Sequence, residues 1–428
     1  MRGVWTREET DVREENLLNE RLRDDAEAIV KAAIAAVGPE KAVHRALQGR
    51  RFSGRLYMVA VGKAAWRMAR TAADCLDRPP EAGLVITKYG HVPGPISGVT
   101  CFEAGHPIPD ENSFRATEAV LEMTRALQAD DTVLFLLSGG GSALFEKPLL
   151  DAAELQEITA QLLACGAAVA EINTIRKRLS AVKGGRFAEW CAPAHVEAVV
   201  LSDVLGDAPD AIASGPTVSD GSTCAEAMEI ARKYRLKLSE DAWGLLRRET
   251  PKSLQNSKYR IVGSVRELCR AAASAAESLG YEPVLLTDHL DCQARHAGIF
   301  LADILKTHAA DGRRLAYLAG GETVVRLTGN GLGGRNQELA LAAAERIEGI
   351  PGVCVISVGS DGTDGPTDAA GGYADGDTCR TLAGRGVRIA EVLAENDAYH
   401  ALRDVDGLVF TGPTGTNVND IAVALISG

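Results

Sequence analysis

Five short predicted strands constrain the fold most, because each ends in a turn rich in glycine or in charged residues. They end at residues 61, 137, 201, 328 and 358. The run 132–137 (TVLFLL) is apolar on both faces, as a central strand of a parallel sheet is. Helical patterns follow several of these runs, so we predict an α/β protein. In open α/β sheets, ligands bind at the carboxyl ends of the strands, which makes these turns the candidate site.

The chain is long enough for two domains. It has 428 residues, and the strand pattern is lost between residues 236 and 258, where we expect the boundary. We therefore predict an N-terminal domain of residues 1–240 and a C-terminal domain of residues 241–428. Residues 14–48 read as one or two helices broken at Gly38-Pro39, and the chain is expected to end with a helix capped near Asn419 or Asp420.

Composition excludes several classes of protein. The net charge of −12 and the lack of a long Lys/Arg block disfavour nucleic-acid binding. Nine cysteines are scattered without a C-x-x-C pair, which suggests neither a disulfide framework nor a thiolate zinc site. No apolar run has the length of a membrane span, and the N-terminus lacks a signal-peptide core, so we predict a cytoplasmic protein.

The stretch 320–338, GGETVVRLTGNGLGGRNQE, combines several polar features. We expect a short strand at 324–327, a glycine-rich loop at 329–334 and a helix that begins near Arg335. Free backbone N–H groups at a helix N-terminus attract anions, so a phosphate or carboxylate is expected here. The loop also spells G-x-G-x-x-G, but no acidic residue ends a second strand about 20 residues on, as a dinucleotide site requires. A glycine-rich loop without any ligand is the alternative.

The turns after three other predicted strands contain a lysine, a run of glycines and an aspartate. Lys63 follows the run that ends at 61, Ser138-Gly139-Gly140-Gly141-Ser142 follows 132–137, and Asp203 follows the run that ends at 201. A lysine on a helix's first turn is often only a surface residue, and aspartate is common in plain turns.

Two further segments are ambiguous from the sequence alone. The basic segment 171–190 is either a solvent-exposed helix face or an anion-binding one, and its polar candidates are Asn173, Arg176, Lys177, Arg178 and Lys183. The acidic turn 359–368 either holds a divalent cation or is a simple turn.

Together these groups are typical of phosphoryl transfer. Cations and backbone N–H groups offset the charge of the moving phosphoryl group, while carboxylates hold Mg²⁺ or accept a proton. Neither the Walker A motif nor the protein-kinase motifs occur, so a kinase here belongs to another class.

Six motifs in this order resemble the glycerate 2-kinase family of the MOFRL class: LLSGGGSAL, INTIRKRLSAVKGGR, LSDVLGD with ASGPT, GGETVVRLTGNGLGGRNQE, SVGSDGTDGPTDAAGG and TGPTGTNVND. The resemblance runs from about residue 14 to the C-terminus. It implies a kinase that uses ATP and Mg²⁺ to convert D-glycerate to 2-phosphoglycerate. It also implies a Rossmann-like N-terminal domain with a mostly parallel sheet, a smaller C-terminal α/β domain, and an active site in the cleft between them.

The family's important positions correspond to Lys63, Asp203, Arg335 and Asp361. We expect Lys63 and Arg335 to stabilise the transferred phosphoryl group, or one of them to hold the glycerate carboxylate, and Asp203 to act as the base or a metal ligand. Asp361 and Asp364 are the predicted Mg²⁺ ligands. The predicted substrate- and phosphate-binding residues are Ser138, Gly139, Gly140, Gly141, Ser142, Glu322, Gly333, Gly334 and Asn336.

Two other functions fit parts of the sequence. The runner-up is a hydroxypyruvate reductase that uses NAD(P)H, for which the G-x-G-x-x-G match is the support. A non-catalytic sensor of sugar acids or nucleotides is the third. The expected partners are D-glycerate and a nucleotide, and a homo-oligomer is compatible with the sequence. The residues alone leave open whether the 2- or the 3-hydroxyl is phosphorylated.

Overall fold

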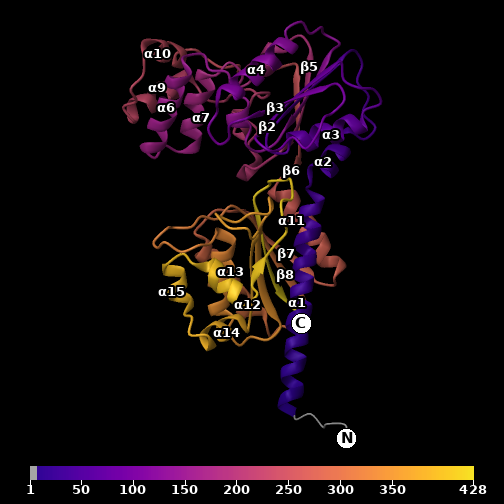
Figure 1. The fold of residues 1–428 in the computed structure, drawn as a ribbon, viewed down its shortest axis with the longest axis vertical. Helices are drawn as coiled ribbons and strands as arrows, with labels where there is room; N and C mark the ends of the chain where they lie inside the picture. The colour runs from indigo at the N-terminus through magenta and orange to yellow at the C-terminus, as the bar shows by residue number, and fades with distance from the viewer. Residues whose placement is uncertain (1–6) are drawn as a thin grey trace. The chain divides into compact units, whose positions relative to one another are not determined.

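The chain folds into two compact α/β units (Figure 1). The computed structural model describes the backbone of residues 7–428 and the side chains of residues 17–428. We call residues Pro39–Val262 the Lys63 unit, and the chain up to Gly38 together with Gly263–Gly428 the Arg335 unit. The predicted domain limits at 240 and 241 stay a prediction.

The Lys63 unit is built on a six-stranded sheet with the order β3-β2-β1-β4-β5-β6. Its first five strands pair in parallel. This is the strand order of a Rossmann fold, in which the chain reverses direction across the sheet between β1 and β4. The predicted α/β fold with a Rossmann-like parallel sheet is confirmed. The strands are β1 (Leu56–Val61), β2 (Ala82–Lys88), β3 (Val99–Ala104), β4 (Thr132–Leu137), β5 (His195–Leu201) and β6 (Ser257–Gly263).

Helices cover both faces of this sheet. As a result, β1 and β4 are buried along their whole length. One face packs against α2 (Pro39–Leu47) and α3 (Ala65–Cys75) through residues such as Val43 and Met68. The other packs against α4 (Glu111–Met123), α5 (Gly141–Leu144) and α8 (Arg186–Trp190). There the rings of Phe135, Phe145 and Phe187 lie 5.2–5.6 Å apart, within the range of favourable aromatic pairs.

A cluster of four helices within the Lys63 unit has a small core of its own (Figure 1). Its helices are α6 (Ala152–Ala164), α7 (Val169–Leu179), α9 (Cys224–Lys233) and α10 (Glu240–Leu246). Leu162, Ile175 and Leu246 are fully buried in that core. This helical cluster therefore forms a stable wall beside the sheet, and α6 and α7 line a cavity described below.

The Arg335 unit contains a mixed sheet with the order β11-β10-β9-β12-β8-β7. Among the strand pairs described for this sheet, β7 and β8 are parallel. The strand β12 is antiparallel to both β8 and β9. The strands are β7 (Glu282–Leu290), β8 (Leu315–Gly321), β9 (Val353–Gly359), β10 (Gly371–Asp375), β11 (Leu408–Val409) and β12 (Asp420–Ile426).

Two predicted elements of this unit are wrong. The C-terminal segment is the strand β12, because its apolar residues are buried on both faces between β8 and β9, whereas we expected a helix. Residues 324–327 are not a strand, and only Val324 forms an isolated bridge, with Gln293.

Helices also sandwich the second sheet (Figure 1). One face packs against α12 (Ala294–His308) and α13 (Arg335–Arg346), and the other against α1 (Arg7–Ala36) and α11 (Val265–Ser278). The break between α1 and α2 at Gly38-Pro39 is as predicted. The remaining helices are the short η1 (Leu205–Asp207) and η2 (Ile212–Ser214), and α14 (Thr378–Gly384), α15 (Ile389–Ala394) and α16 (Ala398–Asp404). Within the described residues, no helix combines the length and apolar character needed to cross a membrane.

Candidate functional site

Lys63 lies in the turn between β1 and α3, at the point where the sheet of the Lys63 unit reverses its order. Its backbone N–H donates to the carbonyl of Gly139 (2.8 Å). The next N–H, of Ala64, donates to Oγ of Ser138 (3.0 Å). The turn after β1 is therefore bonded directly to the loop after β4, which brings the predicted lysine and the predicted glycine loop together.

Gly62 makes this contact between the two turns feasible. Its φ is +122°, and a side chain there would collide with Ser138. Ser138 is buried, and its N–H donates to the carbonyl of Val61 (2.9 Å). These bonds make Ser138 a structural part of the junction, while its predicted role as a phosphate ligand stays a prediction.

Asp203 follows β5 and lies against the same loop. A Cβ atom on Gly139 would overlap its carboxylate, so only glycine lets the backbone and Asp203 approach this closely. The structure thus brings Lys63, the 138–142 loop and Asp203 to one edge of the sheet, as the sequence predicted.

His106 is a fourth member of this group that the sequence did not single out. Its ring lies against Gly140, where a Cβ atom would stand 2.9 Å from Cδ2 of the imidazole. Burial, together with the positive charges of Lys63 and Lys88, lowers the pKa of His106 to about 4. The imidazole is therefore neutral at pH 7 and can donate or accept a hydrogen bond there. The sequence shows only an isolated histidine in a loop, and nothing in it predicts this contact.

The basic segment 171–190 is not a solvent-exposed face, because its cations are buried. Lys177 pairs with Asp220 (3.1 Å), and both Lys177 and Arg178 are almost fully buried. Lys183 pairs with the buried Glu146 (3.2 Å), and burial lowers the pKa of its ammonium group to about 8. This network is structural, since an unpaired buried charge would be costly.

Two cations of this segment, Arg176 and Lys183, contact the 138–142 loop. The Nη2 atom of Arg176 donates to the carbonyl of Ser142 (2.9 Å) and lies 3.6 Å from the carboxylate of Glu146. Nζ of Lys183 donates to the same carbonyl (2.9 Å). Ser142 is therefore fixed by two cations, and Arg176 contacts the predicted phosphate loop.

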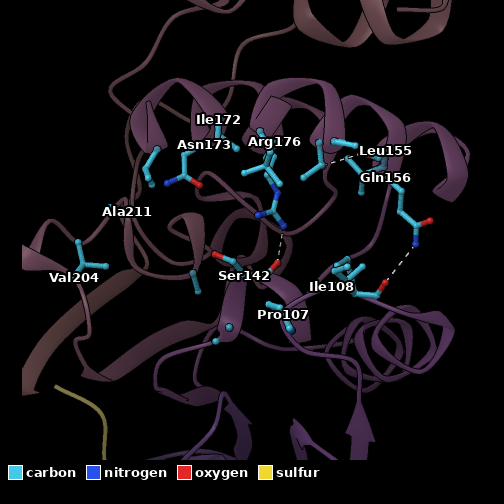
Figure 2. Close-up of a pocket in the computed structure, with 18 of the residues that line it drawn as sticks. Pro107, Ile108, Ser142, Leu155, Gln156, Ile172, Asn173, Arg176, Val204 and Ala211 are labelled. Carbon is cyan, nitrogen blue, oxygen red and sulfur yellow. Dashed lines mark hydrogen bonds between the residues drawn. The ribbon is translucent and has the colours of Figure 1, made fainter. Parts of the chain in front are cut away.

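A cavity of about 850 Å³ opens beside this loop (Figure 2). Gly140, Ser142, Asn173, Arg176 and Asp203 are among the residues that line it. The rest of the wall is mostly aliphatic and comes from the segment after β3 and from α6 and α7. These aliphatic side chains include Ile108, Leu155, Leu163, Val169 and Ile172.

Arg335 begins α13 in the other unit and is held by two carboxylates. Its Nε and Nη2 atoms donate to the two oxygens of Asp420 (2.5 and 2.9 Å), and Nη1 donates to Glu322 (2.9 Å). Burial raises the pKa of Asp420 to about 6 against the opposing effect of Arg335. Burial disfavours the guanidinium charge, yet Asp420 and Glu322 hold the pKa of Arg335 above its ordinary value. A guanidinium has five N–H donors, so two remain for a ligand.

Asp364 occupies the N-terminus of α13, where we expected an anion. Its two oxygens accept the backbone N–H groups of Asn336 (3.1 Å) and Gln337 (2.9 Å). Burial raises the pKa of this carboxyl group although these N–H groups oppose the shift. The protein's own carboxylate therefore serves as the anion at this helix end. The metal role of Asp364 stays a prediction.

The neighbouring polar residues are also held by hydrogen bonds within the protein. Asn336 donates its side-chain amide to Asp364 (3.2 Å) and accepts a hydrogen bond from Ser357 (2.6 Å). Asp361, at the end of β9, accepts both the N–H and the hydroxyl of Thr363 (3.0 Å each). The described residues contain no group of three or more His, Cys, Asp or Glu side chains arranged to hold a metal ion. The roles of Asn336 and Asp361 stay predictions.

The glycine loop 329–334 packs against the turn between α15 and α16. Side chains on Gly329 or Gly331 would collide with Glu395 or Asp397. The N–H of Gly331 donates to Glu395, and that of Leu332 donates to Asp397. These glycines are thus explained by packing. They also lie eight or more residues beyond β8, whereas a dinucleotide fingerprint follows its strand directly.

Gly333, Gly334 and Glu322 line a second cavity, of about 650 Å³, together with Arg335. These predicted residues therefore lie around one cavity, while their binding of substrate or phosphate stays a prediction.

Comparison with known proteins identifies the family. A family model described as a domain of unknown function, DUF4147, matches residues 25–247, and the MOFRL family model matches residues 315–420. A D-glycerate 2-kinase from Thermotoga maritima is 51% identical over 413 residues, which cover 95% of this chain and 99% of that protein. The chain belongs to the glycerate kinase family. The family membership predicted from the six motifs is confirmed.

A solved member of the glycerate kinase family has the same fold. The crystal structure of glycerate kinase from Thermotoga maritima superposes with a TM-score of 0.92 at 50% identity, covering 95% of this chain and all of that one. A relative from Agrobacterium vitis, provisionally named a hydroxypyruvate reductase, is 38% identical over 93% of each chain. The kinase name is carried by the relative that is 51% identical, whereas the relative with the reductase name is 38% identical.

Proposed function

We propose that this protein is a glycerate 2-kinase, which transfers the terminal phosphoryl group of ATP to the 2-hydroxyl of D-glycerate with Mg²⁺. The proposal rests on family membership and on one structural observation: Lys63, the 138–142 loop and Asp203 meet at the carboxyl edge of β1, β4 and β5. This edge is where open α/β sheets bind nucleotides and similar ligands. A cytoplasmic location and a homo-oligomeric state remain proposals.

Each of these groups has a role that fits phosphoryl transfer. The ammonium group of Lys63 offsets negative charge on the phosphoryl group as it moves. Asp203 accepts the proton of the acceptor hydroxyl or holds Mg²⁺. His106 is neutral, so it adds no charge and can hold a hydrogen-bonded group in place beside Gly140.

The acids present fit Mg²⁺ as kinases use it. Mg²⁺ is usually held by one or two carboxylates and by the phosphates of the substrate, so it needs no cluster of three protein ligands. Asp203 is the candidate in the Lys63 unit, and Asp361 remains the candidate in the Arg335 unit. When bound, the ion would neutralise the charge of the phosphate chain.

Arg335 keeps its predicted role as a second cation for the reaction. Its two remaining donors can form the bidentate contact that suits a carboxylate or a phosphate. That it acts in the same reaction as Lys63, in a cleft between the domains, remains a proposal.

A coupled assay tests the proposed function. ADP release that requires both ATP and D-glycerate, with 2-phosphoglycerate identified by NMR, is the expected result. Oxidation of NAD(P)H with hydroxypyruvate in the absence of ATP would instead establish the reductase. Binding of D-glycerate or ATP without ADP release would establish a sensor.

A further inference from the structure

The ends of three neighbouring strands of the Lys63 unit carry basic residues. Ile86 and Ala104 are buried in the same core cluster, and Lys88, two positions after Ile86, pairs in register with Ala104. Because side chains alternate along a strand, Lys88 leaves β2 on the face of that cluster. Lys63 and His106 follow the last residues of β1 and β3 by two positions. The carboxyl edge of β1, β2 and β3 therefore carries three basic residues.

Lys63 and His106 meet at Gly140, in the loop after β4. A Cβ atom on Gly140 would stand 3.0 Å from Nε2 of His106 and 3.3 Å from Cγ of Lys63, so both side chains lie against this glycine. The charge of Lys88 also acts at this point. Burial has the largest effect in lowering the pKa of His106, and the charges of Lys63 and Lys88 lower it further. Both ammonium groups are thus near the imidazole.

The turn after β2 is attached to Lys63 by hydrogen bonds. The Nδ1 atom of His91 donates to the carbonyl of Lys63 (3.2 Å), and its backbone N–H donates to the carbonyl of Lys88 (3.2 Å). The carboxylate of Glu103, on β3, accepts the backbone N–H groups of His91 and Val92 (2.9 and 3.0 Å). These bonds fix the two lysines relative to each other, and they engage Glu103 with the backbone of the turn.

The ammonium groups of Lys63 and Lys88 have no carboxylate partner in the part of the chain that the structure describes. The buried lysines of the same unit, by contrast, are paired: Lys177 with Asp220 and Lys183 with Glu146. Two positive charges beside one imidazole repel each other, and a bound anion would offset that repulsion.

The imidazole of His106 is likewise available to a ligand. Neither of its ring nitrogens has a hydrogen-bond partner among the described residues. A neutral imidazole offers one N–H donor and one acceptor. One imidazole N–H and one ammonium group together match the two oxygens of a carboxylate.

We propose that Lys88 and His106 bind the carboxylate of D-glycerate and select an acid as the acceptor. The inference rests on the proposed function. In a 2-hydroxy acid, the carboxyl group and the reacting hydroxyl share one carbon, so the carboxylate must bind close to the group that accepts the hydroxyl proton. Asp203, the candidate base, lies against Gly139, and the next residue, Gly140, contacts His106. This arrangement leaves Lys63, beside them, to act on the phosphoryl group.

A neutral side chain of similar length tests Lys88. In Lys88→Met we expect the KM for D-glycerate to rise at least about tenfold, with kcat and the KM for ATP within about twofold, because the contact exists in the ground state and the transition state alike. Lys88→Arg keeps the charge and should recover most of the affinity for D-glycerate. Lys41→Met removes an exposed lysine of the same unit, and this matched control should change none of these values.

D-Glyceramide, whose neutral amide replaces the carboxylate, tests which group is recognised. The wild type should prefer D-glycerate in kcat/KM, and Lys88→Met should reduce this preference at least about tenfold. His106→Phe keeps a ring but removes its hydrogen-bonding nitrogens, and it should reduce the preference as well. Inhibition by inorganic tripolyphosphate should not change in Lys88→Met. Weaker inhibition by tripolyphosphate with an unchanged preference would assign Lys88 to the phosphate chain and overturn the inference.

Calorimetry with D-glycerate alone separates this inference from the proposed function. Weaker binding in Lys88→Met than in the wild type, in a chain that releases no ADP, would support the carboxylate site and reject the kinase. Equal binding by Lys88→Met in an active kinase would overturn the site and leave the proposed function standing. If Lys88→Met does not fold, Lys88→Gln replaces it in each measurement.

Discussion

Gly139 and Asp203 lie so close together that a Cβ atom on the glycine would overlap the carboxylate oxygen Oδ2 of the aspartate. We expect Gly139→Ala to displace Asp203 or the loop and to lower kcat/KM for D-glycerate at least about 100-fold, as a displacement of about 1 Å does. The measurement is the coupled ADP assay. Gly221→Ala is the control, because its Cβ would meet no atom within 4 Å, and it should behave like the wild type.

Lys63 and Arg335 should differ in what their removal does to stability. We expect Lys63→Ala and Arg335→Ala each to lower kcat by at least about 100-fold, because each cation acts mainly on the transition state. Only Arg335→Ala leaves the buried Asp420 without its ion-pair partner, which should cost about 3 kcal/mol of unfolding free energy. Urea denaturation measures this difference. Near-normal turnover in either variant would remove that residue from the catalytic group.

His106 should make the protein less stable in acid. Its pKa is about 4 in the folded chain and about 6.5 in the unfolded chain, so the unfolded state binds more protons between these values. The stability present above pH 6.5 is therefore lost as the pH falls toward 4. Relative to His106→Gln, the wild type should lose on the order of 1 to 2 kcal/mol over this range, after allowance for partial exposure of the ring.

An NMR titration of the His106 ring tests the cause of this shift. The midpoint should lie near pH 4 in the wild type and rise in Lys63→Met, because one repulsive charge is gone while burial remains. A midpoint near 6.5 in the wild type would contradict the buried, neutral imidazole.

Asp364 should act as the cap of α13. Asp364→Ala should lower the unfolding free energy by about 1 to 2 kcal/mol, because two N–H groups lose their acceptor. Gly334→Ala should have a similar effect, since its Cβ would overlap that carboxylate. Asp130→Ala, at an exposed position, is the control and should change stability by less than about 0.5 kcal/mol. A large rise in the Mg²⁺ concentration needed for half-maximal activity, without a loss of stability, would instead identify Asp364 as a metal ligand.

The strands that carry the Lys63 site could be predicted from the sequence because their signal is local. A run such as 132–137 is apolar on both faces, and the glycines and charged residues follow it directly along the chain. The strand β12 could not be predicted in this way. Its residues, DIAVALI, are short and rich in alanine, and they become a strand only because β8 and β9 bury both faces.

The sequence by itself determined the family, the α/β class and the neighbourhood of Lys63, the 138–142 loop and Asp203. Only the tertiary structure decided which carboxylate each cation pairs with. Lys177 and Arg176 are adjacent in sequence, yet Lys177 is almost fully buried beside Asp220, while Arg176 lines the cavity beside the 138–142 loop. Likewise, Asp364 takes the helix end that a ligand was expected to fill. The physical reason is that a charge's partner is set by folding, which brings together residues tens of positions apart, whereas a sequence pattern reports only what lies next to each residue along the chain.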